Sequence, residues 1–78
     1  MLKKKLSLIL TFATTTQAMA VEVFCHRQGL PGRLIPVPRE ITAGCGLSWK
    51  TQPEEQRTLL DALEKGGLVW QHCHLIEV

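Results

Sequence analysis

The stretch LSLILTFATTTQAMAVEVF, residues 6–24, decides what this chain can fold into. Its first seven residues are rich in Leu, Ile and Thr, a composition that favours a buried β-strand. The hydroxyls of Thr14 to Thr16 can cap a helix that continues over residues 17–28, and Gly29 occupies the usual position at its C-terminal end. One apolar stripe then runs along this helix at three- and four-residue spacing: Ala18, Val21, Cys25 and Gln28. On this interpretation the chain opens with a strand and a helix.

The same stretch also has the features of a secretory signal. Lys3, Lys4 and Lys5 precede a short apolar run, and Ala18-Met19-Ala20 predicts cleavage after Ala20. The run is too short to cross a bilayer. Cleavage would leave 58 residues (78 − 20), without the strand and half of the helix. The residues alone leave both interpretations open.

The composition predicts a single small domain over residues 1–78, with residues 1–5 as a flexible basic start. Nine basic and seven acidic residues give a net charge of +2, and three of the bases are Lys3 to Lys5. The remainder is close to neutral and contains only two Phe, two Trp and no Tyr. A nucleic-acid partner is therefore not expected, because neither a basic face nor a base-stacking platform can be assembled.

The rest of the chain predicts three more strands and one more helix. Residues 33–37 and 45–50 favour strands, and residues 68–78 favour a terminal strand. Between them, a Thr51-x-x-Glu54 capping box predicts a helix over residues 53–65, with Leu59, Leu60 and Leu63 packing inward and Gly66-Gly67 ending it. This order predicts an α+β fold, the ferredoxin-like βαββαβ sandwich, in which a four-stranded antiparallel sheet carries two helices on one face. The other sheet face is then exposed or buried in a partner, which makes a homodimer possible.

Three cysteines without CxxC spacing argue against a disulfide scaffold or a zinc site, so we expect free thiols in a reducing compartment. Cys45 stands out because Gly44 and Gly46 flank it and leave its sulfur little cover. Arg39, in the same loop, could fold back to lower the thiol pKa or to hold an anion. The alternatives are an inert Cys45 at a tight strand entry and an Arg39–Glu40 loop ion pair. Cys25 is most simply a buried core thiol.

His72-Cys73-His74 looks like a metal-binding tract, but strand geometry divides it. Neighbouring strand residues point to opposite faces, so His72 and His74 share one face and Cys73 points to the other. A weak Cu(II), Zn(II) or Ni(II) site at His72 and His74 would need another ligand, such as His26 or a residue of a second copy. The alternative is that both are ordinary half-exposed strand histidines. Trp49 and Trp70 are most simply packing residues.

The segment RLIPVPREITAGCGLSW, residues 33–49, carries a family resemblance. An apolar strand ends in a proline, Pro38-Arg39-Glu40-Ile41 follows, and Cys45-Gly46-Leu47 comes after three small residues. Upstream, Phe12, Thr14 to Thr16, Ala18 and Glu22 fit the same pattern. The chain resembles the selenium/sulfur (Se/S) carrier protein-like family of small bacterial proteins. The resemblance implies that residues 6–16 belong to the fold and that the protein is cytoplasmic. The three lysines at the start depart from the family pattern, so export with cleavage after Ala20 remains an alternative. The His72-Cys73-His74 tract near the end also departs from it, so metal binding remains a second alternative.

The resemblance implies a carrier rather than an enzyme, with no cofactor. Cys45 would hold a persulfide or selenopersulfide that passes from a donor such as a cysteine desulfurase to an acceptor protein. Gly44 and Gly46 would give access and backbone N–H groups, and Arg39 would supply positive charge. A ferredoxin-like regulatory or partner-binding module without thiol chemistry is the alternative, and a small metal-binding protein that uses His72 and His74 is another. No membrane association is expected in any of these cases.

Overall fold

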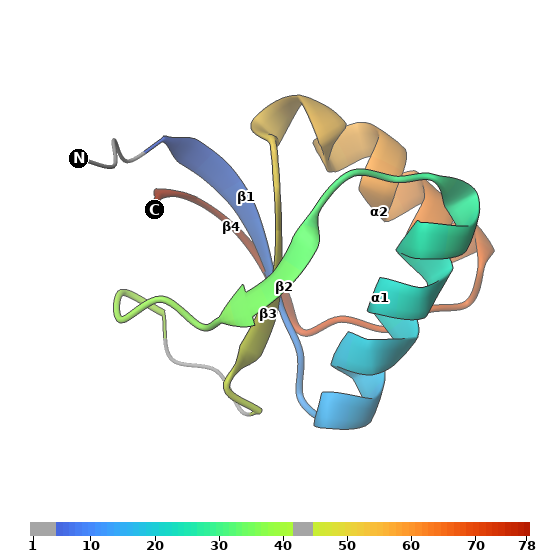
Figure 1. The fold of residues 1–78 in the computed structure, drawn as a ribbon, viewed down its shortest axis with the longest axis horizontal. Coiled ribbons are helices and arrows are strands. Elements are labelled where there is room, and N and C mark those ends of the chain that lie inside the picture. The colour runs from blue at the N-terminus through green and yellow to red at the C-terminus, as the bar shows by residue number, and fades with distance from the viewer. Residues whose placement is uncertain (1–4, 42–44) are drawn as a thin grey trace.

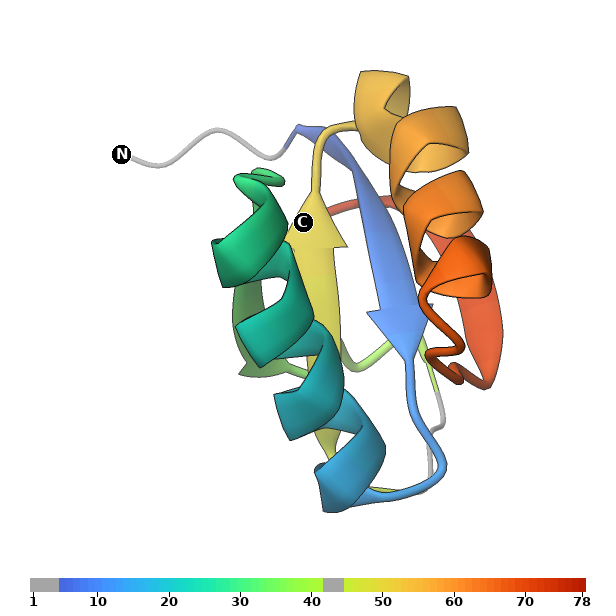
Figure 2. The ribbon, with the colours of Figure 1, turned by 90° about the vertical axis from the view of Figure 1, so that its right-hand side faces the viewer.

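The predicted order of elements is confirmed. The computed structural model describes residues 5–41 and 45–78. Figure 1 shows its strands and helices, whose bounds are β1 (Leu6–Thr11), α1 (Thr15–Gln28), β2 (Arg33–Pro36), β3 (Leu47–Thr51), the short 3-10 helix η1 (Pro53–Glu55), α2 (Gln56–Lys65) and β4 (His72–Glu77). The four strands form one sheet in the order β2-β3-β1-β4, and every neighbouring pair is antiparallel. Both helices cover the same face (Figure 2), so the fold is the α+β, ferredoxin-like sandwich.

Strand β1 is an inner strand of this sheet. Its Leu10 lies opposite Trp49 of β3 on one side and opposite Cys73 of β4 on the other. Residues 7–12 are all buried, which fits the apolar sequence that predicted a strand here. Removal of residues 1–20 would therefore take out a strand that holds two others together.

Helix α1 begins and ends as its sequence predicts. The Thr14 hydroxyl accepts a hydrogen bond from the Gln17 backbone N–H at 3.2 Å, so Thr14 is the capping residue. At the other end Gly29 adopts a left-handed φ of 69°. The predicted stripe is buried at Ala18, Val21 and Cys25, whereas Gln28 in the last turn is exposed.

The predicted capping box at Thr51 is wrong. Thr51 ends β3, and its buried hydroxyl donates to the Pro31 carbonyl at 3.0 Å instead of capping a helix. The chain then enters η1 after Gln52, which makes no side-chain capping bond, and α2 follows directly. The inward face of α2 is as expected: Leu59 and Leu63 are buried, and Leu60 is half-buried.

The main core lies between the sheet and the two helices. It is a cluster of buried side chains from β1, α1, β3 and α2: Leu8, Leu10, Phe12, Ala18, Val21, Cys25, Trp49, Leu59 and Leu63. Trp70 packs against this cluster while remaining half-buried. Gly32 lies against Trp49, because a Cβ at residue 32 would stand 2.5 Å from the indole Nε1. The two tryptophans are therefore packing residues, as the sequence suggested.

The second sheet face has a smaller buried apolar pair. Ile9 alternates with Leu8 and Leu10, so it points away from the helices, yet it is fully buried. Ile41 is also buried, and both residues lie outside the main core cluster. Figures 1 and 2 show residues 37–41 on the side of the sheet away from the helices. We infer that Ile41 covers part of this face, which leaves less of it open than a bare sheet would.

Candidate functional site

Cys45 lies at the end of the sheet from which α1 begins. The register sets Thr11, the last residue of β1, opposite both Ser48 and His72. Pro36 lies opposite Leu47 in the same region. The ends of β1 and β2 and the starts of β3 and β4 therefore meet at one end of the sheet. Cys45 enters β3 there, and α1 starts four residues after β1.

The Cys45 sulfur makes a local contact with the backbone of Leu47. The Leu47 N–H donates to Sγ at 3.4 Å, and the thiol S–H can donate to the Leu47 carbonyl at 3.5 Å. The side chain is half-buried and packs against the core cluster. The backbone of β3 thus supplies a fixed donor to this sulfur, which sequence reasoning did not identify.

Gly46 follows this cysteine in a conformation that favours glycine. It has a left-handed φ of 80°, and its carbonyl accepts a hydrogen bond from the Val37 N–H at 3.0 Å. A Cβ built on Gly46 would meet no atom within 4 Å. Glycine is therefore favoured here by conformation, and no described residue other than its two chain neighbours crowds the position of a side chain at residue 46. Gly44, the other predicted supporting glycine, lies outside the described residues.

Arg39 is exposed in the turn that carries the Pro-Arg-x-Ile motif. The Ile41 N–H donates to the Pro38 carbonyl at 3.0 Å, which closes this turn, and Ile41 is buried. Within residues 5–41 and 45–78 no hydrogen bond or ion pair joins Arg39 to Cys45 or to Glu40. The motif anchors the loop through Ile41, and the visible signal for this was an isolated isoleucine in an otherwise polar loop.

The other two thiols have surroundings that suppress ionisation. Burial raises the pKa of Cys25 to about 11. Burial also raises the pKa of Cys73, although the Gln56 side chain, whose Nε2 donates to Sγ at 3.6 Å, acts in the opposite direction. Burial thus disfavours the thiolate form of both side chains. This agrees with the expectation that Cys25 is a core thiol and leaves Cys45 as the candidate.

The histidines of β4 lie as strand alternation predicts. Cys73 packs against the core on the helix side, so His72 and His74 point to the other face, where their ring centroids are 6.1 Å apart. His26, the third ligand suggested by the sequence, lies on α1 and hence on the opposite side of the sheet (Figure 2). In the part of the chain that the structure describes, no three His, Cys, Asp or Glu residues are placed to hold a metal ion.

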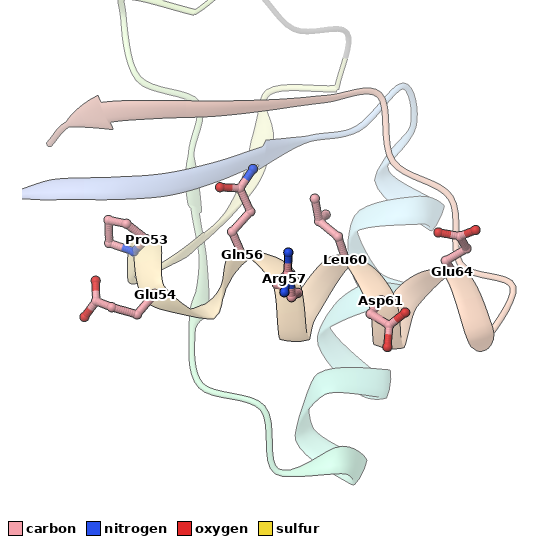
Figure 3. Close-up of a pocket in the computed structure, with 7 residues that line it drawn as sticks. All are labelled: Pro53, Glu54, Gln56, Arg57, Leu60, Asp61 and Glu64. Carbon is pink, nitrogen blue, oxygen red and sulfur yellow. The ribbon is translucent and has the colours of Figure 1, made fainter.

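Two surface hollows lie along the helices and do not include Cys45. One, of about 600 Å³, follows α2 and is lined by Pro53, Glu54, Gln56, Arg57, Leu60, Asp61 and Glu64. Figure 3 shows Gln56 and Leu60 directed toward the strands, whereas Glu54 and Asp61 point away from them. The other, of about 470 Å³, is lined by Thr16, Met19, Ala20, Val23, Phe24, Arg27 and Leu68. The Cys45 thiol is thus outside both hollows.

Comparison with known proteins gave one match. A family model described as "Putative Se/S carrier protein-like" matches residues 7–75, nearly the whole chain. No curated protein and no solved structure matches. Neither described helix has the length and apolar character that crossing a membrane requires.

Proposed function

Because the chain belongs to the Se/S carrier protein-like family, we propose that it carries sulfur or selenium on Cys45 as a persulfide or selenopersulfide. The observation that carries the proposal is the contrast among its thiols. The Cys45 side chain is half-buried, as is that of Cys73, but the Cys45 sulfur receives the Leu47 N–H, whereas burial raises the pKa of both Cys25 and Cys73. A carrier needs one accessible thiolate, and Cys45 best meets that requirement.

Loading is an exchange between a thiolate and a persulfide. The Cys45 thiolate attacks the outer sulfur of a donor persulfide, such as that of a cysteine desulfurase. A bond forms between Sγ and the outer sulfur while the S–S bond of the donor breaks. The donor leaves as a thiolate, and the proton of the outer sulfur stays with it on Cys45. Unloading repeats this step with a nucleophile of the acceptor protein, and neither step requires an external oxidant or a cofactor.

The loop around Cys45 supports this exchange. We propose that the uncrowded position at Gly46 lets the donor persulfide reach the sulfur, and that the Leu47 N–H hydrogen-bonds to this sulfur during the exchange. Arg39 is exposed on the same loop, so its role is to attract an anionic persulfide or an acidic partner surface. Gly44 is the second glycine that we propose gives the donor access to Cys45. We further propose that the carrier works in the cytoplasm, because cleavage after Ala20 would remove β1.

The test is loading in vitro followed by intact-mass and peptide mass spectrometry. The full chain is incubated with a cysteine desulfurase and cysteine, and separately with a selenocysteine lyase and selenocysteine. We expect one added sulfur or selenium atom on Cys45 and none on Cys45→Ser. Cys73→Ser is the matched control, because it removes the other half-buried thiol and should load normally. Loading of Cys45→Ser to the same extent, or an unmodified wild-type chain with both donors, would overturn the proposal.

A partner-binding module without thiol chemistry is the second candidate, and one observation favours it. Met19 and Val23 are about half exposed on α1 and line the apolar hollow of about 470 Å³. A regulatory module would use such a surface and would keep its function in Cys45→Ser. A pull-down from the native host with wild-type and Cys45→Ser baits separates the two: a module binds equally with both, and a carrier loses its disulfide-trapped partners with the second.

A further inference from the structure

The two edges of the sheet differ in what they offer to another strand. In an antiparallel pair, residues alternate between those bonded to the neighbouring strand and those whose N–H and C=O point outward. Lys5 and Val78 exchange two backbone hydrogen bonds, of 3.2 and 3.1 Å. Counting inward from this pair, the outward-pointing residues of β4 are Glu77, Leu75 and Cys73. In the described part of the chain no strand pairs with these groups.

The opposite edge, β2, is blocked. The bond from the Val37 N–H to the Gly46 carbonyl fixes its alternation, so Leu34 and Pro36 point outward. Pro36 has no N–H, and β2 is only four residues long. Proline and short length are the usual means by which natural proteins protect a sheet edge. The β4 edge is six residues long and has neither proline nor lysine.

We propose that the outer edge of β4 pairs with β4 of a second copy of this chain, antiparallel, about a two-fold axis at Leu75. Leu75 would then exchange both backbone hydrogen bonds with its own counterpart, and Cys73 would pair with Glu77 of the second copy. In this register the outward backbone N–H and C=O groups of all three residues on each chain have hydrogen-bond partners. The result is a continuous eight-stranded sheet with the helices of both copies on one side.

The side chains favour this register over its neighbours. Leu75 is 49% exposed, so apolar surface meets apolar surface at the axis. A register centred on Glu77 would set two carboxylates opposite each other, which is unfavourable. A register centred on Cys73 would leave the outward groups of Glu77 without partners. The outward backbone groups and the side chains of β4 therefore both favour pairing of this edge with β4 of a second copy.

The test is a concentration series of the full chain by sedimentation or light scattering. We expect the mass to rise from one chain to two as concentration increases. Leu75→Pro removes an outward N–H that makes no hydrogen bond in the monomer, so the sheet of each chain should be retained. Each dimer would lose two central hydrogen bonds, so dimerisation should weaken at least about tenfold. Leu75→Lys keeps that N–H but sets two like charges at the axis, and it should weaken the dimer as well. Val23→Lys is the matched control: Val23 is also 49% exposed but lies on α1, so its dimer should be unchanged.

Hydrogen exchange of the wild-type chain keeps the proposal testable if a Leu75 variant fails to fold. The amides of Cys73, Leu75 and Glu77 should exchange more slowly at high than at low protein concentration. A wild-type chain that stays monomeric throughout the series would overturn the proposal. A dimer in which these three amides exchange freely, or one that both folded Leu75 variants still form, would overturn it too.

Discussion

At the scale of single residues, the three cysteines show how one sequence assigns different chemistry to identical side chains. Cys25 faces the core from a helix, and Cys73 lies under Gln56 on an edge strand. Cys45 stands half-buried at a strand entry, where its sulfur accepts the Leu47 N–H. Burial penalises the charged form of a thiol, and an N–H donor favours it. Location therefore disfavours the thiolates of Cys25 and Cys73.

Alkylation of the native chain should follow this order. Treated with iodoacetamide near pH 7.5 and analysed by peptide mass spectrometry, Cys45 should be modified at least about tenfold faster than Cys73, because only thiolates react. Cys25 should react only after denaturant is added. Equal rates for Cys45 and Cys73 in the folded chain would contradict the assignment of Cys45 as the accessible thiol.

The buried thiol of Cys25 should also make stability depend on alkaline pH. Its pKa is raised from 9.0 to about 11, so the folded state holds the proton that the unfolded state releases. The contribution of this protonated thiol to the free energy of unfolding is fully present below pH 9 and is lost as the pH rises toward 11. At pH 10, one pH unit above the unfolded pKa, the loss is about 1.4 kcal/mol, from about 1.4 kcal/mol per pKa unit. Urea unfolding of wild type and Cys25→Ala at pH 7 and pH 10 measures it: the free energy of unfolding should fall more in wild type, and parallel losses would disprove the linkage.

At the scale of helices and strands, local sequence signals predicted the helix ends correctly where no residue distant in sequence competed for the same hydrogen-bonding group. Thr14 and Gly29 mark the two ends of α1 as expected, because each acts on backbone groups within a few residues of itself. Thr51 failed as a helix cap because its hydroxyl bonds to Pro31, which is 20 residues away in sequence. The same limit applies at the site. The sequence predicted an accessible Cys45 from its flanking glycines, and the side chain is half-buried; the Leu47 N–H contact depends on side-chain geometry that spacing does not encode.

Gly32 and Gly29 provide a matched pair for the packing of these elements. Both have positive φ, but a Cβ at residue 32 would stand 2.5 Å from Trp49 Nε1 and 2.8 Å from the Lys50 carbonyl oxygen, whereas one at residue 29 meets nothing within 4 Å. Gly29→Ala should cost about 1 kcal/mol of unfolding free energy from backbone strain alone. Gly32→Ala should cost about 3 kcal/mol, because overpacking is added to that strain. Chemical denaturation gives both values, and equal losses would mean that the loop shifts away from Trp49 freely.

At the scale of the whole molecule, the sequence order of strands and helices was enough to predict the topology. Few arrangements of strand, helix, strand, strand, helix, strand satisfy short, right-handed connections. What the order did not predict is the Ile9 and Ile41 pair on the second sheet face. That pair depends on the path of one loop, and a loop path is set by tertiary contacts rather than by periodicity.

Removal of residues 1–20 should abolish folding altogether. Residues 21–78 would lack β1, through which β4 is joined to β3, and with it Leu8, Leu10 and Phe12 of the core. A fragment of 58 residues (78 − 20) has too little remaining core to compensate. Its far-ultraviolet circular dichroism should be that of an unfolded chain, with no cooperative thermal transition. A cooperative transition would restore the secretory interpretation of the first 20 residues.

The paired hydrogen bonds between Lys5 and Val78 have a consequence for chain connectivity. They hold the two ends of the fold side by side, so a short linker from residue 78 to residue 5 would close the chain into a ring. New ends could then be opened in the exposed Gly66-Gly67 turn, where a Cβ on Gly67 meets no atom within 4 Å. Such a circular permutant would keep every strand pairing while β1 and β4 became consecutive in sequence.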